Sequence, residues 1–176
     1  MRPDGSFKSR LVVPSQNFTS AFPKLGYMGI KKLFECRGVS YGHRTILNRY
    51  DLKMKLEPLG LQPDGATIIS LDIEKMYPSI KFGLVQKAVN YYGRSLSDVD
   101  KATIRDCLEM IGFGMSNTLV TFLDKYYRYD GRVDIVGKGL TIGGYESAWL
   151  ADLVASFLLE KSDQHFDNCL FNGIYC

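Results

Sequence analysis

One apolar run of the sequence ends on a carboxylate that could bind a metal ion. Residues 66–73 are rich in strand-forming side chains, and Asp72 lies at the end of this run, followed by Ile73. A buried strand that ends on Asp holds an anionic oxygen rigidly at its carboxyl end, where a divalent cation can bind. Tyr77, five positions after Asp72, would then lie close to that ion. A strand that ends on Asp is also a common structural event, so a purely structural role is the alternative.

The elements around this run are mostly helical patterns with a few strands. Short strands are expected at residues 7–14 and 66–73, and Asp130-Gly131 between Tyr-rich and Val/Ile-rich arms indicates a hairpin. Ser97 and Asp100 have the spacing of a capping box, and Ser116 is a second expected N-cap. Apolar spacing and terminating glycines predict helices at residues 26–37, 45–56, 78–93, 97–111, 116–124 and 147–163. Helices gathered around few strands indicate an α+β architecture.

Composition and charge narrow the class of protein. The chain is 45% hydrophobic and 23% charged, as in ordinary globular proteins, and no apolar run approaches the roughly 20 residues of a membrane span. The four cysteines lie far apart, which favours a reducing compartment over a zinc site or a disulfide framework. Residues 1–55 hold 11 Lys/Arg against 3 Asp/Glu, whereas residues 56–176 hold 11 against 16. This asymmetry suits a protein that binds phosphates with one part and metal ions with the other, and a solvated basic face is the alternative.

The segment 68–80 resembles motif A of reverse transcriptases. In that motif an Asp and four variable residues precede an aromatic, a Ser and an aliphatic residue, and Asp72 and Tyr77 match the first two fixed positions. The resemblance implies that Asp72 is the catalytic carboxylate and a metal ligand, and that the main-chain carbonyl of Ile73 is another ligand. It implies two Mg²⁺ ions, which activate the attacking oxygen and neutralise the leaving pyrophosphate. Tyr77 would lie under the incoming sugar and favour deoxynucleotides.

The segment 139–160 resembles motif B of the same family, a glycine-containing turn that leads into an amphipathic helix. Its layout after a hairpin resembles the Penelope-like branch most. Gly143 and Gly144 match the turn, where the absence of side chains lets the template and the nucleotide approach the backbone. Ser147 fits the family's Ser and is expected to cap the helix. Ile142 stands where many relatives have Gln or Met, so a polar contact to the nucleotide, and with it fidelity and activity, is in doubt.

Both ends of the chain extend the resemblance. Arg10 resembles the fingers Arg that binds the triphosphate, and Lys8 could assist it. Arg suits this role because its planar guanidinium donates two parallel hydrogen bonds to phosphate oxygens. Residues 171–176 resemble the start of motif C, with Tyr175 and Cys176 as the two residues before an Asp pair. That Asp pair supplies the remaining metal ligand in the family.

The resemblance also implies the fold and the domain organisation. We expect an α+β fold with a polymerase palm-like sheet packed with helices, plus part of the fingers. Residues 1–65 would be a fingers-like basic region and residues 66–176 a palm region, without a thumb. Because it holds only one of the usual metal carboxylates, this piece is expected to be inactive by itself. Its partner would be the remainder of the polymerase chain, with the thumb and the Asp-Asp hairpin.

The function implied is that of an RNA-directed DNA polymerase, a nucleotidyltransferase of a retroelement. Its partners would be an RNA or DNA template with a primer and deoxynucleoside triphosphates, with no membrane. It would be intracellular, and nuclear if the retroelement is eukaryotic. One alternative is a family B DNA polymerase, since residues 76–80 also resemble that family's Leu-Tyr-Pro-Ser-Ile motif, although its Lys-rich helix pattern is absent. The other is a non-catalytic module that keeps a polymerase-like fold and binds nucleic acid without synthesis.

Overall fold

Helices make up most of the part of the chain that the structure describes. The computed structural model describes residues 18–41, 45–46, 48–60, 73, 76–122, 125–128, 139–162 and 174–175. Its longest helices are α1 (Ala21–Cys36), α4 (Phe82–Tyr92), α5 (Asp98–Ser116) and α6 (Ser147–Ser162). The shorter ones are α2 (Arg49–Leu56), α3 (Met76–Ser79) and the 3₁₀ turns η1 (Phe18–Ser20), η2 (Glu57–Leu59) and η3 (Gly93–Ser95). No helix within these ranges is both long enough and apolar enough to cross a membrane.

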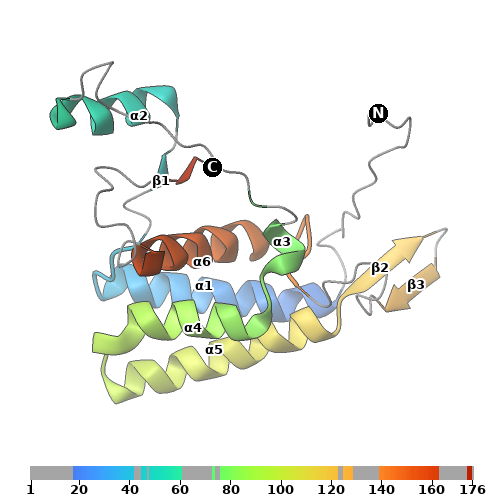
Figure 1. Ribbon diagram of the computed structural model, residues 1–176. Coiled ribbons are helices and arrows are strands. Elements are labelled where there is room, and N and C mark those ends of the chain that lie inside the picture. Colours follow the sequence, from blue (N-terminus) through green and yellow to red (C-terminus); the bar gives the residue numbers. More distant parts are fainter. Residues whose placement is uncertain are drawn as a thin grey trace, which may run out of the picture.

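Helix α5 runs antiparallel to α1 along its whole length (Figure 1). Near one end of the contact Gly114 of α5 packs against Pro23 of α1, and at the other end Asp100 bonds to Arg37, which directly follows α1. Between them, Gly26 leaves no room for a side chain, since an added Cβ would lie 2.5 Å from a backbone oxygen of α5. The two helices therefore approach each other closely, and glycine is required at this crossing.

Helices α4 and α6 lie side by side and run in the same direction (Figure 1). At their C-terminal ends the Tyr92 hydroxyl donates a hydrogen bond of 2.9 Å to Glu160, and Tyr91 packs on Phe157 with ring centroids 5.2 Å apart. Because α4 is antiparallel to α5, as α1 is, helices α1, α4 and α6 all begin at the same end of the bundle. The segments before these three helices are thereby brought together.

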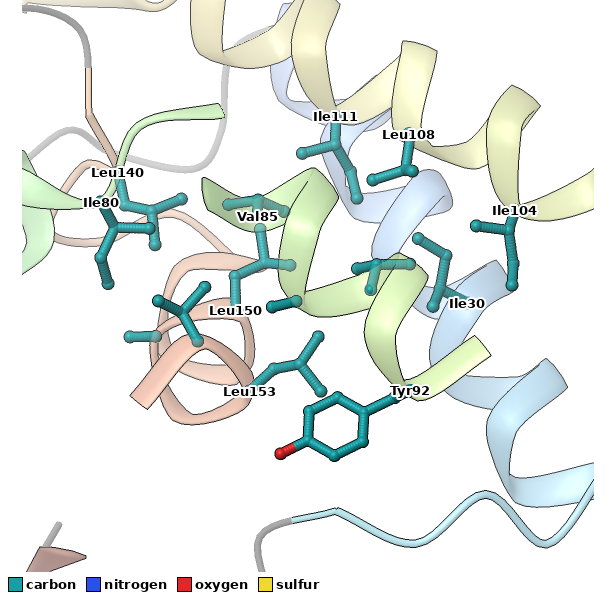
Figure 2. Packing of buried hydrophobic residues seen from close by; sticks show 14 of the residues in the cluster. Ile30, Ile80, Val85, Tyr92, Ile104, Leu108, Ile111, Leu140, Leu150 and Leu153 are labelled. Atoms are coloured by element: carbon teal, nitrogen blue, oxygen red, sulfur yellow. The ribbon is translucent and has the colours of Figure 1, made fainter. Parts of the chain in front are cut away.

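The hydrophobic core lies between the four long helices (Figure 2). Fully buried side chains come from each of them: Ile30 and Phe34 of α1, Val85 and Val89 of α4, Ile111 of α5, and Leu150, Leu153 and Val154 of α6. In α6, residues 150, 151 and 153–156 are all buried, so this helix is enclosed on almost every side. Each large aliphatic side chain buried here contributes roughly 1.5–3 kcal/mol of transfer free energy. The core therefore fixes the position at which α6 begins.

The α+β class with a palm-like sheet, expected from the sequence, is wrong for the described residues. Their strands form two separate two-stranded sheets, in which β1 (Thr45–Ile46) pairs parallel with β4 (Ile174–Tyr175) and β2 (Leu119–Phe122) pairs antiparallel with β3 (Lys125–Arg128). Neither forms a layer under the helices (Figure 1). The apolar faces of the long helices cover one another instead, so no sheet is needed to bury them. The strand predicted at 7–14 and the one predicted at 66–73, except for Ile73, lie outside the described residues.

The helices predicted from apolar spacing are confirmed with shifted boundaries, except one. The patterns at 26–37, 97–111 and 147–163 correspond to α1, α5 and α6. The pattern at 45–56 corresponds to α2 only from Arg49, since residues 45–46 form β1, and the pattern at 78–93 is divided into α3 and α4 at residues 80–81. The helix predicted at 116–124 is wrong, because Ser116 ends α5 and β2 follows it. Val120 and Thr121 are β-branched and pair with Tyr127 and Tyr126 across the hairpin, and this pairing outweighed the capping signal of Ser116. The Tyr-rich arm forms β3 and pairs with β2, whereas the hairpin turn predicted at Asp130-Gly131 and the Val/Ile-rich arm after it lie outside the described residues.

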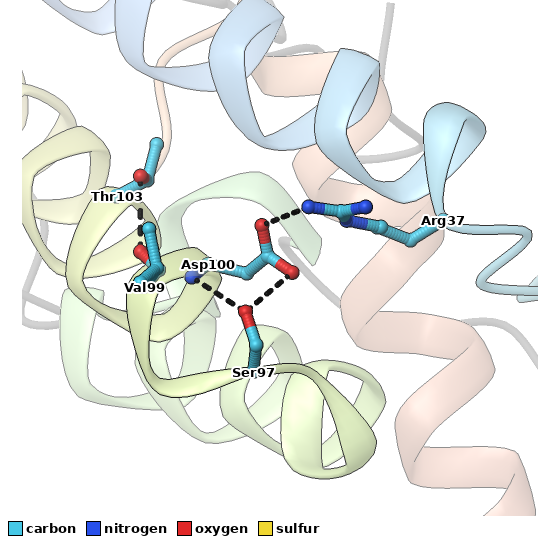
Figure 3. A network of polar contacts seen from close by, with 5 residues as sticks. All are labelled: Arg37, Ser97, Val99, Asp100 and Thr103. Carbon is cyan, nitrogen blue, oxygen red and sulfur yellow. Dashed lines mark hydrogen bonds and ion pairs between the residues drawn. The ribbon is translucent and has the colours of Figure 1, made fainter.

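A polar network joins α1 to the start of α5 (Figure 3). The Ser97 hydroxyl caps α5: it accepts from the Asp100 backbone N–H at 3.2 Å and donates to the Asp100 carboxylate at 2.8 Å, so the predicted cap is confirmed. The Arg37 guanidinium donates to the other carboxylate oxygen of Asp100 at 2.9 Å. The bond from Arg37, followed by that from Ser97, lowers the pKa of Asp100 below its ordinary value.

Replacing Asp100 with Asn is expected to destabilise the fold at neutral pH and to matter less in acid. In the unfolded chain Asp100 has its ordinary pKa of 3.8, and its lower pKa in the fold means that folding favours the ionised form. This stabilisation is fully present above pH 3.8 or so, and it is lost as the pH falls through the lower folded pKa. Urea unfolding of both proteins from neutral to strongly acid pH measures the difference. A stability gap that stays constant across that acid range would contradict the expectation.

Candidate functional site

The segment that follows Tyr77 is bonded directly to the segment that precedes the glycine-rich turn. The Leu140 backbone N–H donates to the Ile80 carbonyl at 3.2 Å, and Lys81 and Gly139 form an antiparallel bridge. Two stretches far apart in the sequence, one from each reverse-transcriptase-like motif, are thus paired through their backbones.

This pairing is anchored in the core. Ile80 and Leu140 are 4% and 3% exposed, and their side chains lie close to each other beside Val85 (Figure 2). Gly139 is buried, and a Cβ built on it would overlap the Pro78 carbonyl group and lie 2.7 Å from the Pro78 Cα. Because backbone atoms cannot yield as a flexible side chain does, the two segments can pack this closely only with glycine at position 139.

The glycine-rich turn itself has two distinct requirements for glycine. Gly143 has a φ of 99°, a backbone conformation that residues with a Cβ rarely adopt. At Gly144 an added Cβ would lie 2.5 Å from the Ser147 hydroxyl and 2.8 Å from a Glu146 carboxylate oxygen. The turn then passes into α6, where the Leu150 N–H donates to the Glu146 carbonyl at 2.9 Å. The backbone conformation therefore favours glycine at position 143, whereas at position 144 a larger residue would meet the side chains of Ser147 and Glu146.

Glu146 places a buried carboxyl group at the start of α6. It is 7% exposed, and no basic residue within the described part of the chain forms an ion pair with it. Burial raises the pKa of Glu146, while its own backbone N–H and the nearby Ser147 hydroxyl oppose the rise. The Glu146 carbonyl accepts the first helical bond, so Ser147 lies one residue inside the helix. The expected capping role of Ser147 is wrong for this reason: its buried Oγ has no partner in hydrogen-bond geometry among the described residues.

A contact between Lys24 and Tyr145 at this end of the bundle is not predicted by the sequence. Lys24 of α1 places its Nζ 4.4 Å from the ring centroid of Tyr145, the residue between the glycine pair and Glu146. Tyr145 is 46% exposed. A cation over an aromatic ring from a distant helix leaves no local pattern in a single sequence, and only the basic excess of residues 1–55 pointed toward it.

The site residues predicted from the sequence divide by whether the structure describes them. Those outside the described residues are Lys8, Arg10, Asp72 and Cys176. The others lie within the described residues. Ile73 is 51% exposed, and Tyr77 is half-buried against the core. Gly143 and Gly144 form the turn described above, and Tyr175 of β4 pairs with Ile46 of β1. The structure thus brings the Tyr77 segment and the start of the glycine-rich segment together.

The described residues do not by themselves supply a metal centre. Among them no three His, Cys, Asp or Glu side chains cluster as metal ligands would. Oxygen donors of the kind that Mg²⁺ prefers are present in the predicted pair of the Asp72 carboxylate and the Ile73 carbonyl, of which only Ile73 is described.

A cavity of about 690 Å³ lies at the opposite end of the bundle, where α1, α4 and α6 end. Its charged and aromatic groups already have partners within the protein: Arg37 bonds to Asp100, Glu160 accepts from Tyr92, and Arg94 lies 4.5 Å over the Tyr91 ring. Because these groups already have partners within the protein, none of them needs a ligand to complete its interactions. The end of the bundle that carries the glycine-rich turn is the better candidate.

Comparison of the chain with protein-family models, with curated proteins and with solved structures finds no match. The residues at the glycine-rich end and their geometry are therefore the basis for inferring a function.

Proposed function

We propose that this chain takes part in template-directed DNA synthesis, as part of an RNA-directed DNA polymerase. The observation that carries the proposal is the backbone pairing of residues 80–81 with residues 139–140. It supports the proposal because the two motifs that resemble reverse transcriptases meet in space although they lie far apart in the sequence. The proposed function depends on these motifs and their contact, and not on a palm-like sheet.

The paired segments offer two features that could recognise a nucleotide: an aromatic ring for its sugar and a turn that its base or phosphate could approach. Tyr77 presents a half-buried aromatic ring held against the core, which suits packing against a sugar. The turn at Gly143 and Gly144 exposes backbone without side chains, so a planar base or a phosphate can approach it closely. Both parts are fixed by buried anchors, Ile80 and Leu140, and binding would therefore require little ordering of the protein.

The metal ligands in this proposal are Asp72 and the Ile73 carbonyl. Mg²⁺ held there would polarise the phosphate and stabilise the attacking and leaving oxygens. In a eukaryotic retroelement such a protein would act in the nucleus.

A non-catalytic nucleic-acid-binding module is the second candidate, and Ile142 favours it. This side chain is half-buried and apolar at the position where the resemblance expects a polar contact to the nucleotide. The glycine-rich turn would then still receive a strand of nucleic acid. Such a module would bind primer–template in a salt-dependent manner without metal-dependent synthesis.

Primer extension distinguishes the two candidates. The 176-residue chain and the full-length product of its gene would each be given a primed RNA template, deoxynucleotides and Mg²⁺, with ribonucleotides and EDTA as controls. Synthesis that needs Mg²⁺ and deoxynucleotides supports the polymerase. If neither protein extends the primer although both are folded and bind primer–template, the polymerase proposal fails and the binding module is favoured.

A further inference from the structure

Tyr145 and Lys24 form an aromatic and cationic surface at the glycine-rich turn, on which Tyr145 is exposed and Lys24 is half-buried. The Lys24 Nζ lies 4.4 Å from the Tyr145 ring centroid, yet the tyrosine side chain is still 46% exposed. Lys24 forms no ion pair with an acidic residue among the described residues, so no carboxylate of that part of the chain neutralises its charge. An aromatic face beside an unneutralised cation is a combination that proteins use to bind single-stranded nucleic acid.

The backbone of both residues of this pair is held in place by tightly packed neighbours. On one side Glu146 and Ser147, the residues next to Tyr145, are buried at 7% and 1% exposure. On the other side Lys24 belongs to α1, which is packed closely against α5 at Gly26. A buried neighbour fixes the backbone of Tyr145 while its ring stays near the surface. The pair is therefore pre-organised, which lowers the entropic cost of binding.

We propose that Tyr145 and Lys24 bind single-stranded nucleic acid: Tyr145 stacks on a base, and Lys24 neutralises an adjacent phosphate. The inference deepens the proposed function, on which it rests, by naming the contact through which an unpaired strand reaches the glycine-rich turn. Gly143, two residues before Tyr145, is exposed and adds no side chain to this surface. The competing explanation is that the cation–π contact only ties α1 to the turn.

The test uses single-stranded oligonucleotides that carry 2-aminopurine, whose fluorescence is quenched by stacking, together with fluorescence anisotropy for affinity. Tyr145→Ala removes the ring, Tyr145→Phe keeps it, and Lys24→Gln removes the charge. The matched control is Tyr50→Ala, because Tyr50 is also exposed, at 66%, with the Arg49 guanidinium 5.1 Å from its ring, but lies on α2 away from the turn. Folding of each variant is checked by circular dichroism, and Tyr145→Leu replaces Tyr145→Ala if the latter does not fold.

Tyr145→Ala is expected to weaken binding about 5- to 100-fold and to remove the quenching, whereas Tyr145→Phe and Tyr50→Ala stay within about twofold of the wild type. Lys24→Gln is expected to reduce the slope of log affinity against log salt by about 0.7. If the unchanged protein does not bind, or if a folded variant without the Tyr145 ring binds as the wild type does, the inference is overturned. Equal losses in the Tyr50 and Tyr145 variants would overturn it as well.

Primer extension by the same preparations separates this inference from the proposed function. Ring-dependent binding without any synthesis leaves the contact standing and removes the polymerase. Synthesis with binding that does not depend on Tyr145 removes the contact and leaves the polymerase standing.

Discussion

Gly139→Ala is expected to lower the free energy of unfolding by roughly 3 kcal/mol, because the new methyl group would meet backbone atoms that cannot move aside. Its Cβ would overlap the Pro78 carbonyl group, and relieving that overlap would separate residues 80–81 from residues 139–140. Urea unfolding measures the loss of stability. Amide hydrogen exchange at Leu140, whose N–H bonds to Ile80, reports whether the pairing itself opens.

Gly83→Ala is the matched control for this change. Gly83 lies in α4 close to the same segments, but nothing lies within 4 Å of its added Cβ. Alanine there is expected to be neutral or to stabilise the helix by up to about 1 kcal/mol. If Gly139→Ala were as stable as Gly83→Ala, the close packing of the two segments would be wrong. In the full-length protein, primer extension that survived an opened pairing would show that the contact does not serve synthesis.

In whichever protein extends the primer, the chain or the full-length product of its gene, Asp72→Asn is expected to reduce primer extension by roughly 10³-fold or more, while affinity for primer–template stays within about twofold. The substitution keeps the size of the side chain and removes the anionic oxygen that would bind Mg²⁺. The loss is expected in the chemical step, so it should appear in single-turnover extension at saturating primer–template.

Glu74→Gln serves as the control for the loss of a charge near the same position. Glu74 falls among the variable residues between Asp72 and Tyr77 in the motif, and its replacement is expected to leave extension within a few-fold of the wild type. Unchanged synthesis by Asp72→Asn would exclude Asp72 as a metal ligand. Equal losses in both variants would point to a general effect of charge on this segment.

Local patterns in the sequence predicted the helices, because each is specified by its own residues. The capping serine Ser97 and the apolar positions of α4 and α6 needed no knowledge of distant segments. The prediction at 116–124 failed because the strand β2 is defined by its partner β3, and a strand's partner is not a local property. The palm-like sheet failed for a related reason, since it was inferred from a family likeness and not from pairing that the residues themselves specify.

The candidate site was predictable in part. Tyr77, Gly143 and Gly144 were predicted because their types match positions of the motifs. The structure explains Gly143 by its φ and Gly144 by the nearby side chains of Ser147 and Glu146. The bond between Leu140 and Ile80 could not be foreseen, because it depends on how the core orients α4 and α6. The contact between Lys24 and Tyr145 depends in the same way on the packing of α1.

The common direction of α1, α4 and α6 gives the bundle an electrical polarity (Figure 1). The aligned peptide dipoles of a helix place about half a positive charge at its N-terminus, and here three of the four long helices direct that end toward the glycine-rich turn. Only α5 opposes them, with its C-terminus at that end. An anionic group that lies within about one helical turn of these three helix starts would therefore be stabilised by the backbone itself, in addition to any side chain.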